Sequence, residues 1–89
     1  MRRHFYEGTA LRNNIKEVVC DYIRTTPECS EYAGGLRTSE IFRECGLDWG
    51  DYKNATSSNQ QYWAVALLRE LESEGKITRD AVTKRWKRI

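Results

Sequence analysis

Apolar residues recur at helical spacing near the start of the chain. From Thr9 to Thr26 they fall every three or four positions, as on one face of a helix, and charged residues fill the other face. Pro27 ends this predicted helix, because the residue before a proline is disfavoured in the helical region. We expect residues 1–8 to form a flexible arm and residues 9–89 to form one domain. The apolar positions are Leu11, Ile15, Val18, Val19, Tyr22 and Ile23, and the polar ones are Arg12, Lys16, Glu17, Asp21 and Arg24.

A second, shorter helix is predicted in the middle of the chain. Residues 28–35 read as a loop, and Leu36-Arg37 as a very short strand. Thr38 is a favourable N-cap for a helix that runs to Cys45, with Ile41 and Phe42 on its inward face. Gly46 fits the position just after a helix end, where positive φ is common.

The last third of the chain predicts a helix followed by a short hairpin. Ser57 and Ser58 offer side-chain oxygens that can cap a helix, and Gly75 follows its last turn. Residues 76–89 then alternate between polar and apolar positions in two runs, which is typical of two strands joined by a tight turn at Asp80. The inward face of this third helix is predicted to carry Ala64, Leu67, Leu68 and Leu71.

The composition is that of a small globular protein. The 89 residues are 39% hydrophobic and 31% charged, which suits one domain with a small core and no deep cleft. No apolar run approaches the ~20 residues of a membrane helix, and the first residues lack the apolar stretch of a signal peptide. We therefore expect no membrane association.

Charge is segregated along the sequence. Residues 76–89 contain six basic residues and one acidic residue, a net charge of +5, whereas residues 27–75 carry four basic and nine acidic residues, a net charge of −5. The whole chain is only +2. A focused positive segment attracts a polyanion. The alternative is a basic end that only keeps the protein soluble.

The three cysteines predict a reducing environment. Their odd number and wide spacing argue against a disulfide framework, so we expect a cytoplasmic (nucleoid-associated) or other reducing intracellular location. Cys20 and Cys45 are expected to be buried as small apolar residues, and Cys29 to be a free surface thiol in a polar loop. The spacing fits no zinc site, and we expect no metal.

The order of elements resembles the winged helix-turn-helix superfamily over residues 9–89. The resemblance is carried by residues 36–41 (LRTSEI) at the entry to the second helix, residues 67–77 (LLRELESEGKI) at the helix-to-strand junction, and Arg85-Trp86-Lys87 in the last strand. It implies an α+β fold in which three helices precede a two-stranded β-hairpin, the wing. It also implies binding to double-stranded DNA.

In a helix-turn-helix the start of the third helix lies nearest the base edges in the major groove. Asn and Gln can pair with adenine, Ser can contact bases or phosphates, and Arg69 can reach a phosphate or a guanine. The alternative is a capped helix start with solvated side chains. The predicted DNA-binding residues are Ser57, Ser58, Asn59, Gln60, Tyr62 and Arg69 in the third helix and Arg79, Lys84, Arg85, Lys87 and Arg88 in the hairpin.

Alternation in the last strand divides its side chains between two faces. Arg85 and Lys87 should share one face, and Lys84, Trp86 and Arg88 the other. Trp86 is expected to pack against the first helix, and the alternative is that it lies along a sugar–phosphate edge. Trp63, between the two faces of the third helix, is expected to be a core residue.

The sequence favours a binding protein over an enzyme. It has one histidine, His4, and no glycine-rich phosphate loop, so we expect neither catalysis nor a cofactor. We interpret the chain as a DNA-binding transcription regulator or an accessory factor of a phage or mobile element, which needs a homodimer or a larger assembly to bind tightly. The alternative is a protein-docking winged helix that uses the aromatic residues Trp49, Tyr52 and Tyr62.

Overall fold

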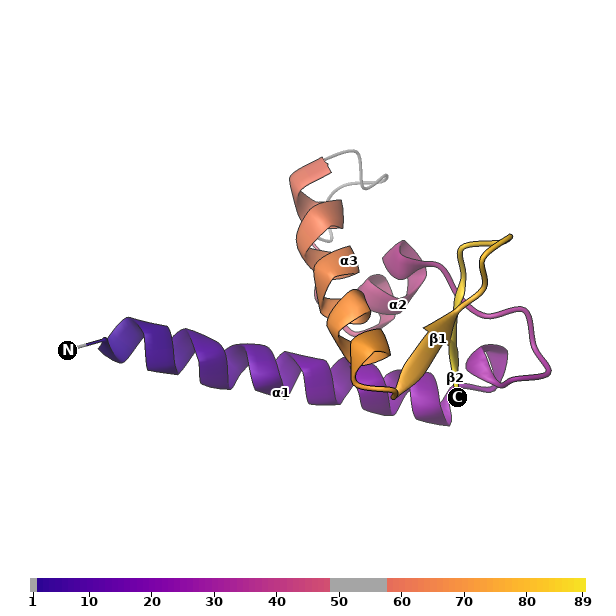
Figure 1. Cartoon of the computed structure of the whole chain (residues 1–89). Helices are drawn as coiled ribbons and strands as arrows, with labels where there is room; N and C mark the ends of the chain where they lie inside the picture. Colours follow the sequence, from indigo (N-terminus) through magenta and orange to yellow (C-terminus); the bar gives the residue numbers. More distant parts are fainter. Residues whose placement is uncertain (1, 49–57) are drawn as a thin grey trace.

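Three helices precede a two-stranded antiparallel hairpin, the α+β layout of a winged helix (Figure 1). A computed structural model describes residues 2–48 and 58–89, with the side chains of residues 58–62 outside the description. The elements are α1 (Arg3–Thr25), a 3-10 turn η1 (Pro27–Cys29), α2 (Thr38–Glu44), α3 (Ser58–Ser73), β1 (Ile77–Arg79) and β2 (Trp86–Arg88).

The hairpin is extended by one residue from the middle of the chain. In the register of the pair, Ile77 lies opposite Arg88, and Arg79 lies opposite Trp86. Leu36 then forms an isolated antiparallel bridge with Trp86, donating its N–H to the Trp86 carbonyl (3.1 Å) and accepting the Trp86 N–H (2.8 Å). The short strand predicted at residues 36–37 is therefore a single bridge on β2.

The core lies where α3, α2, the second half of α1 and the hairpin meet. All four positions predicted for the inward face of α3 are buried, and Trp86 is fully buried in the same cluster as Val19 of α1. Trp63 is only partly covered and packs edge-on against Phe42, with ring centroids 5.1 Å apart. The remaining members of the buried cluster are Cys20, Ile23, Cys29, Ile41, Phe42 and Ile77.

The first helix is longer than predicted and extends away from the rest of the fold (Figure 1). It begins at Arg3, so residues 3–8 are helical rather than an arm without secondary structure. Leu11 and Val18, expected on the inward face, are 63% and 52% exposed. The reason is that the core covers one side of the second half of α1, at Val19 and Ile23, and no residue from 3 to 14 is buried.

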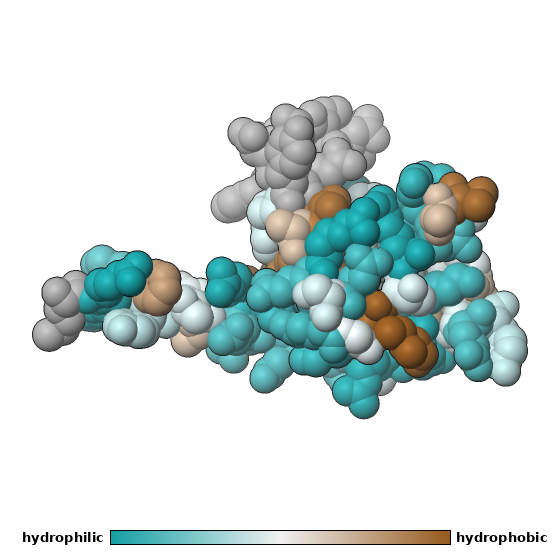
Figure 2. All heavy atoms as spheres, in the orientation of Figure 1, coloured by the Kyte–Doolittle hydropathy of each residue, from teal (hydrophilic) through white to brown (hydrophobic). Residues whose placement is uncertain are grey.

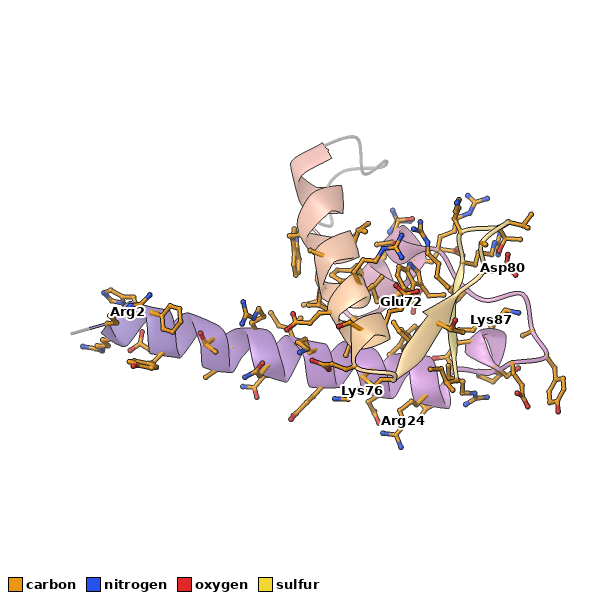
Figure 3. All side chains as sticks on the ribbon, viewed as in Figure 1. Arg2, Arg24, Glu72, Lys76, Asp80 and Lys87 are labelled. Atoms are coloured by element: carbon orange, nitrogen blue, oxygen red, sulfur yellow. The ribbon has the colours of Figure 1, made fainter. Side chains whose placement is uncertain are left out.

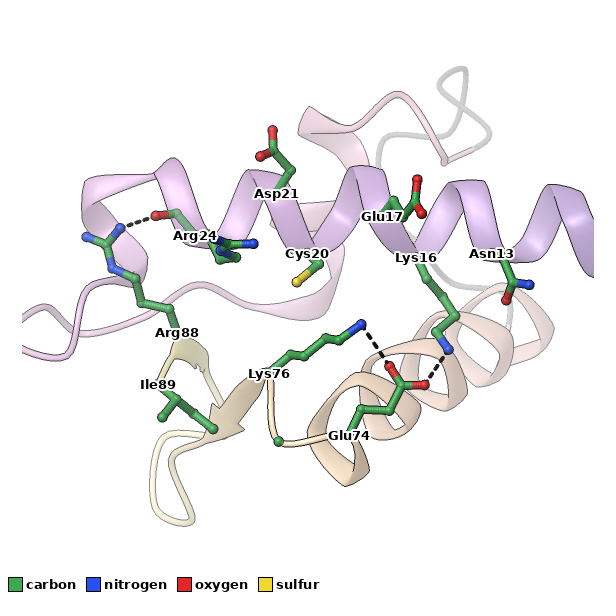
Figure 4. Close-up of a pocket in the computed structure, with 11 residues that line it drawn as sticks. Asn13, Lys16, Glu17, Cys20, Asp21, Arg24, Glu74, Lys76, Arg88 and Ile89 are labelled. Carbon is green, nitrogen blue, oxygen red and sulfur yellow. Dashed lines mark hydrogen bonds and ion pairs between the residues drawn. The ribbon is translucent and has the colours of Figure 1, made fainter.

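Lys16, predicted to face solvent, is buried between α1 and α3. Its Nζ lies 2.6 Å from Glu74 Oε2 and 3.2 Å from Glu70 Oε1, and Glu74 also pairs with Lys76 at 3.4 Å (Figure 4). The hydrogen bond to Glu74 raises the pKa of Lys16, against the opposing effect of burial. The same bond lowers the pKa of Glu74. A charged lysine is tolerated here because two carboxylates compensate it.

The cysteine environments differ from those predicted. Cys29, expected to be a surface thiol, is completely buried because η1 folds the loop back into the core, and burial raises its pKa. Cys20 is buried as predicted, and Cys45 is half-buried with a pKa also raised by burial.

The helix ends follow local chemistry, with one correction at α2. Gly46 and Gly75 have φ values of 70° and 75°, the left-handed conformation predicted after each helix. Arg37, not Thr38, is the N-cap of α2, and the Glu40 carboxylate accepts the Arg37 backbone N–H at 3.0 Å. Thr38 instead accepts the indole N–H of Trp86 at 2.9 Å.

Truncating a fully buried side chain of α3 should weaken the fold strongly. We expect Leu68→Ala to lower the free energy of unfolding by about 2–5 kcal/mol, because it leaves a cavity among the helices. The exposed Val82→Ala serves as control and should change it by less than about 0.5 kcal/mol. Urea unfolding followed by circular dichroism measures both, and equal midpoints for Leu68→Ala and the parent would contradict the assigned core.

The ion pairs at Glu74 should make stability depend on acid pH. Because the folded pKa of Glu74 lies below its ordinary 4.5, its contribution to the free energy of unfolding is complete above that value and is lost as pH falls through the folded pKa. We expect Glu74→Gln to reduce the acid-dependent part of thermal stability, and Glu31→Gln, in the exposed loop, to leave it unchanged. Parallel acid dependence in both variants would refute the assignment.

Candidate nucleic-acid interface

The turn of the wing is longer than predicted and is organised by Asp80. This turn spans residues 80–85 rather than two or three residues, because β2 begins only at Trp86. Asp80 Oδ1 accepts the backbone N–H groups of Val82 (2.8 Å) and Thr83 (2.9 Å), which lowers the pKa of Asp80. The Asp80 carbonyl accepts the N–H of Lys84 (2.9 Å), a residue with φ of 64°.

Two predicted site residues meet at the junction of α3 and the hairpin. The guanidinium carbon of Arg69 lies 5.7 Å from the ring centroid of Trp86, and that of Arg79 lies 5.1 Å from it. Arg69 continues the exposed face of α3 that also carries Ala66 and Ser73. The Trp86 ring therefore holds one cation from the helix beside one from the wing.

Each of these arginines has a second contact. Arg69 Nη1 pairs with Glu72 Oε1 at 2.9 Å, and Figure 3 shows Glu72 on the side of α3 nearest the hairpin. Arg79 Nε donates to the carbonyl of Lys84 at 3.3 Å. Arg79 thus fastens the wing to the junction, and an anion that reaches Arg69 must compete with Glu72.

Arg85 and Lys87 lie on the opposite face of the hairpin from Trp86. Both flank Gly35, since a Cβ at that glycine would come within 3.1 Å of Arg85 Cβ and 3.0 Å of Lys87 Cγ. Thr78, which the sequence reasoning missed, lies opposite Lys87 in the strand register and is exposed on this face. The alternation of residues 76–79 alone would have placed it there.

Arg88 has a different role from the one predicted. It shares the Trp86 side of β2, as alternation requires, but its Nη1 donates to the carbonyl of Arg24 (Figure 4). That carbonyl is in the last turn of α1, where cations are favourable. Arg88 thus ties the hairpin to α1, away from Arg69 and Arg79.

The predicted base-reading residues lie at the edge of the described region. Ser58, Asn59, Gln60 and Tyr62 belong to the first turns of α3, as predicted, and Ser57 lies outside the described residues. Trp49 and Tyr52 of the docking alternative also lie outside them. Which surface these side chains share remains a prediction.

A groove between α1 and the end of α3 is lined by charged residues, among which Lys16 and Lys76 both pair with Glu74. Figure 4 shows Lys16, Asp21 and Arg24 on the wall formed by α1, and Glu74, Lys76 and Arg88 on the wall formed by the end of α3 and the hairpin. Among the described residues, no three His, Cys, Asp or Glu side chains come together as a metal site would require. No described helix is long and apolar enough to cross a bilayer.

Comparison with protein-family models, curated proteins and solved structures finds no match to this chain.

Gly35 should be required for the position of the hairpin face that carries Arg85 and Lys87. Its φ is +83°, and a Cβ there would lie 2.8 Å from the Trp86 carbonyl oxygen, a backbone atom that cannot move aside easily. We expect Gly35→Ala to cost at least about 1 kcal/mol of stability. Gly34→Ala, where nothing lies within 4 Å of a Cβ, is the matched control and should be near neutral. Chemical denaturation distinguishes the two, and equal stabilities would contradict the close approach.

Proposed function

We propose that this protein binds double-stranded DNA as a winged helix, in the manner of a transcription regulator or an accessory factor of a phage or mobile element. The observation that supports this most is the meeting of Arg69 from α3 and Arg79 from β1 on one buried indole. It joins the exposed face of α3 to a wing that carries Lys84, Arg85 and Lys87. Helix and wing thus offer a duplex two cations at one junction, Arg69 and Arg79, while Arg85 and Lys87 lie on the opposite face of the hairpin.

The two parts of this surface would do different work. Lysines and arginines of the wing neutralise phosphates and supply affinity that does not depend on sequence. The first turns of α3, with Asn59 and Gln60, would supply contacts to base edges and hence sequence preference. Arg69 lies farther along α3. It would contact the DNA backbone beside the major groove once a phosphate displaces Glu72.

The wing tip determines how a duplex can lie. Arg79 is on the α3 side of the hairpin and Lys87 on the opposite side, while Lys84 lies in the turn between the strands. A duplex that uses both faces therefore has to cross the tip. Asp80 is the acidic residue of the wing, and its carboxylate is occupied by two backbone N–H groups.

One observation favours the alternative of a protein-docking module. Val82, at the tip of the wing, is 89% exposed, and the tip is brown among mostly teal surface in Figure 2. An apolar tip suits a protein pocket as well as a nucleic-acid groove. The two functions differ in how binding responds to salt.

The test compares double variants that each remove two positive charges. We expect Arg85→Ala with Lys87→Ala to weaken all duplexes alike and to reduce the slope of log affinity against log salt by about 1.8, or about 0.9 for each phosphate that is no longer neutralised. Arg69→Ala with Lys84→Ala should do the same if both faces are used. Arg24→Ala with Lys76→Ala, which removes equal charge near the groove of Figure 4, should leave the slope nearly unchanged.

A further variant separates sequence reading from general affinity. Asn59→Ala should cost about 1–3 kcal/mol on a selected site and little on scrambled DNA. Fluorescence anisotropy at several salt concentrations measures all four variants. The docking module would be the better proposal in either of two cases. In the first, neither the Arg85/Lys87 nor the Arg69/Lys84 double variant binds more weakly than the Arg24/Lys76 control; in the second, the parent binds no duplex at low salt.

A further inference from the structure

The first half of α1 is a helix without a packing partner in the described part of the chain. Residues 3–14 extend beyond the fold as a free-standing projection (Figures 1 and 2), and none of them is buried. Isolated helices of this length are marginal in water, because most helical stability in proteins comes from packing. Leu11 within this segment, and Val18 beyond it, nevertheless expose apolar side chains. The missing packing partner and the exposed apolar side chains indicate that another protein surface covers this segment.

Leu11 and Val18 belong to a heptad stripe, whereas the exposed rings of Phe5 and Tyr6 lie outside it. Positions separated by four, three, four, three and four residues form a single line along α1, whose centre lies about 100° around the helix from the fully buried Ile23 and about 60° from the fully buried Val19. In heptad notation Ile15 occupies an a position and Leu11 a d position, the combination that favours two-stranded parallel coiled coils. The stripe consists of His4, Gly8, Leu11, Ile15, Val18 and Tyr22, of which Ile15 and Tyr22 are half-buried and pack on one side against the core.

Charges beside the stripe select the partner and its direction. In the same notation Glu7 is a g position and Arg12 the e position that follows it, so in a parallel pair Glu7 of one chain meets Arg12 of the other, twice by symmetry. In an antiparallel pair with Leu11 opposite Ile15, Arg12 would meet Arg12 and Glu7 would meet Asp21. Glu7 also pairs with Arg3 of its own chain at 2.8 Å, which leaves its second oxygen 3.6 Å from His4 Nδ1.

We propose that α1 is the dimerisation element of this protein: two copies pair in parallel along the stripe from His4 to Val18, with the Glu7–Arg12 pairs at its edge. The stripe lies on a different side of α1 from the groove lined by Lys16 and Arg24. The proposal does not depend on DNA binding, because its readout is the association of the chain with itself.

Sedimentation velocity of the full chain over a wide concentration range tests the stripe. We expect the parent to dimerise and Leu11→Glu to remain monomeric, because the glutamate would face its own copy across the seam. Ala10→Glu, one position away and also exposed, is the matched control and should still dimerise. Circular dichroism should show both variants folded. A parent that stays monomeric throughout, or a Leu11→Glu variant that dimerises like Ala10→Glu, would overturn the proposal.

A charge exchange tests the direction. Glu7→Arg and Arg12→Glu should each weaken the homodimer by about tenfold, because each turns two attractive pairs into two repulsive ones. Mixing the two variants should restore dimers, since both contacts between positions 7 and 12 then join opposite charges, one of them with its sign exchanged. An antiparallel pair would instead be strengthened by Glu7→Arg, through Asp21, and that result would refute the parallel arrangement.

Discussion

The structure depends on the burial of one side chain, Trp86. Its backbone bonds to Leu36 on one edge and pairs with Arg79 on the other, and its indole N–H donates to Thr38. These contacts join the entry to α2 to the wing, and Arg69 of α3 lies over the same indole. Thr38 and Trp86 are 48 positions apart in the sequence. A buried tryptophan supplies a large apolar area and needs a hydrogen-bond partner for its N–H, and Thr38 meets that need. Trp86 anchors the hairpin against the helices together with Ile77 and Arg88.

Local patterns predicted the helices and hairpin well, because their signals are short-range. The spacing of Leu67, Leu68 and Leu71 identified the buried face of α3, and Gly46 and Gly75 marked two helix ends. The sequence could not predict residues whose environment is set by distant segments. Lys16 is buried because Glu70 and Glu74 arrive from α3, and Cys29 because η1 turns back into the core. Neither residue has a neighbour in sequence that reports this. The length of the wing's turn was also missed, since it is set by the side chain of Asp80.

The same limit applies to the candidate site. Alternation placed Arg85 and Lys87 on one face and Lys84, Trp86 and Arg88 on the other. The structure confirms this for Arg85, Trp86, Lys87 and Arg88, whereas Lys84 lies in the turn with a φ of 64° and belongs to neither strand face. Alternation gave no sign that Arg88 would bond to α1 or that Arg79 would pack over Trp86. Counting charge along the sequence therefore overstates what the hairpin offers a partner. Lys76 pairs with Glu74, and Arg88 bonds to the end of α1. Among the described residues, four cations of the hairpin have neither a carboxylate nor a helix end as partner: Arg79, Lys84, Arg85 and Lys87.

The wing is closed by hydrogen bonds within itself rather than by a partner. Asp80 holds Val82, Thr83 and Lys84 through side-chain and backbone acceptors, and Arg79 bonds across the turn to the Lys84 carbonyl. Its conformational entropy is therefore lost when the chain folds and not when a ligand arrives. Preorganised loops keep more of their contact energy as affinity and release ligands more slowly than loops that must be ordered on binding. In this protein one aspartate sets the rigidity of a six-residue turn. That rigidity determines how much of the free energy of each contact made at the tip is retained as affinity.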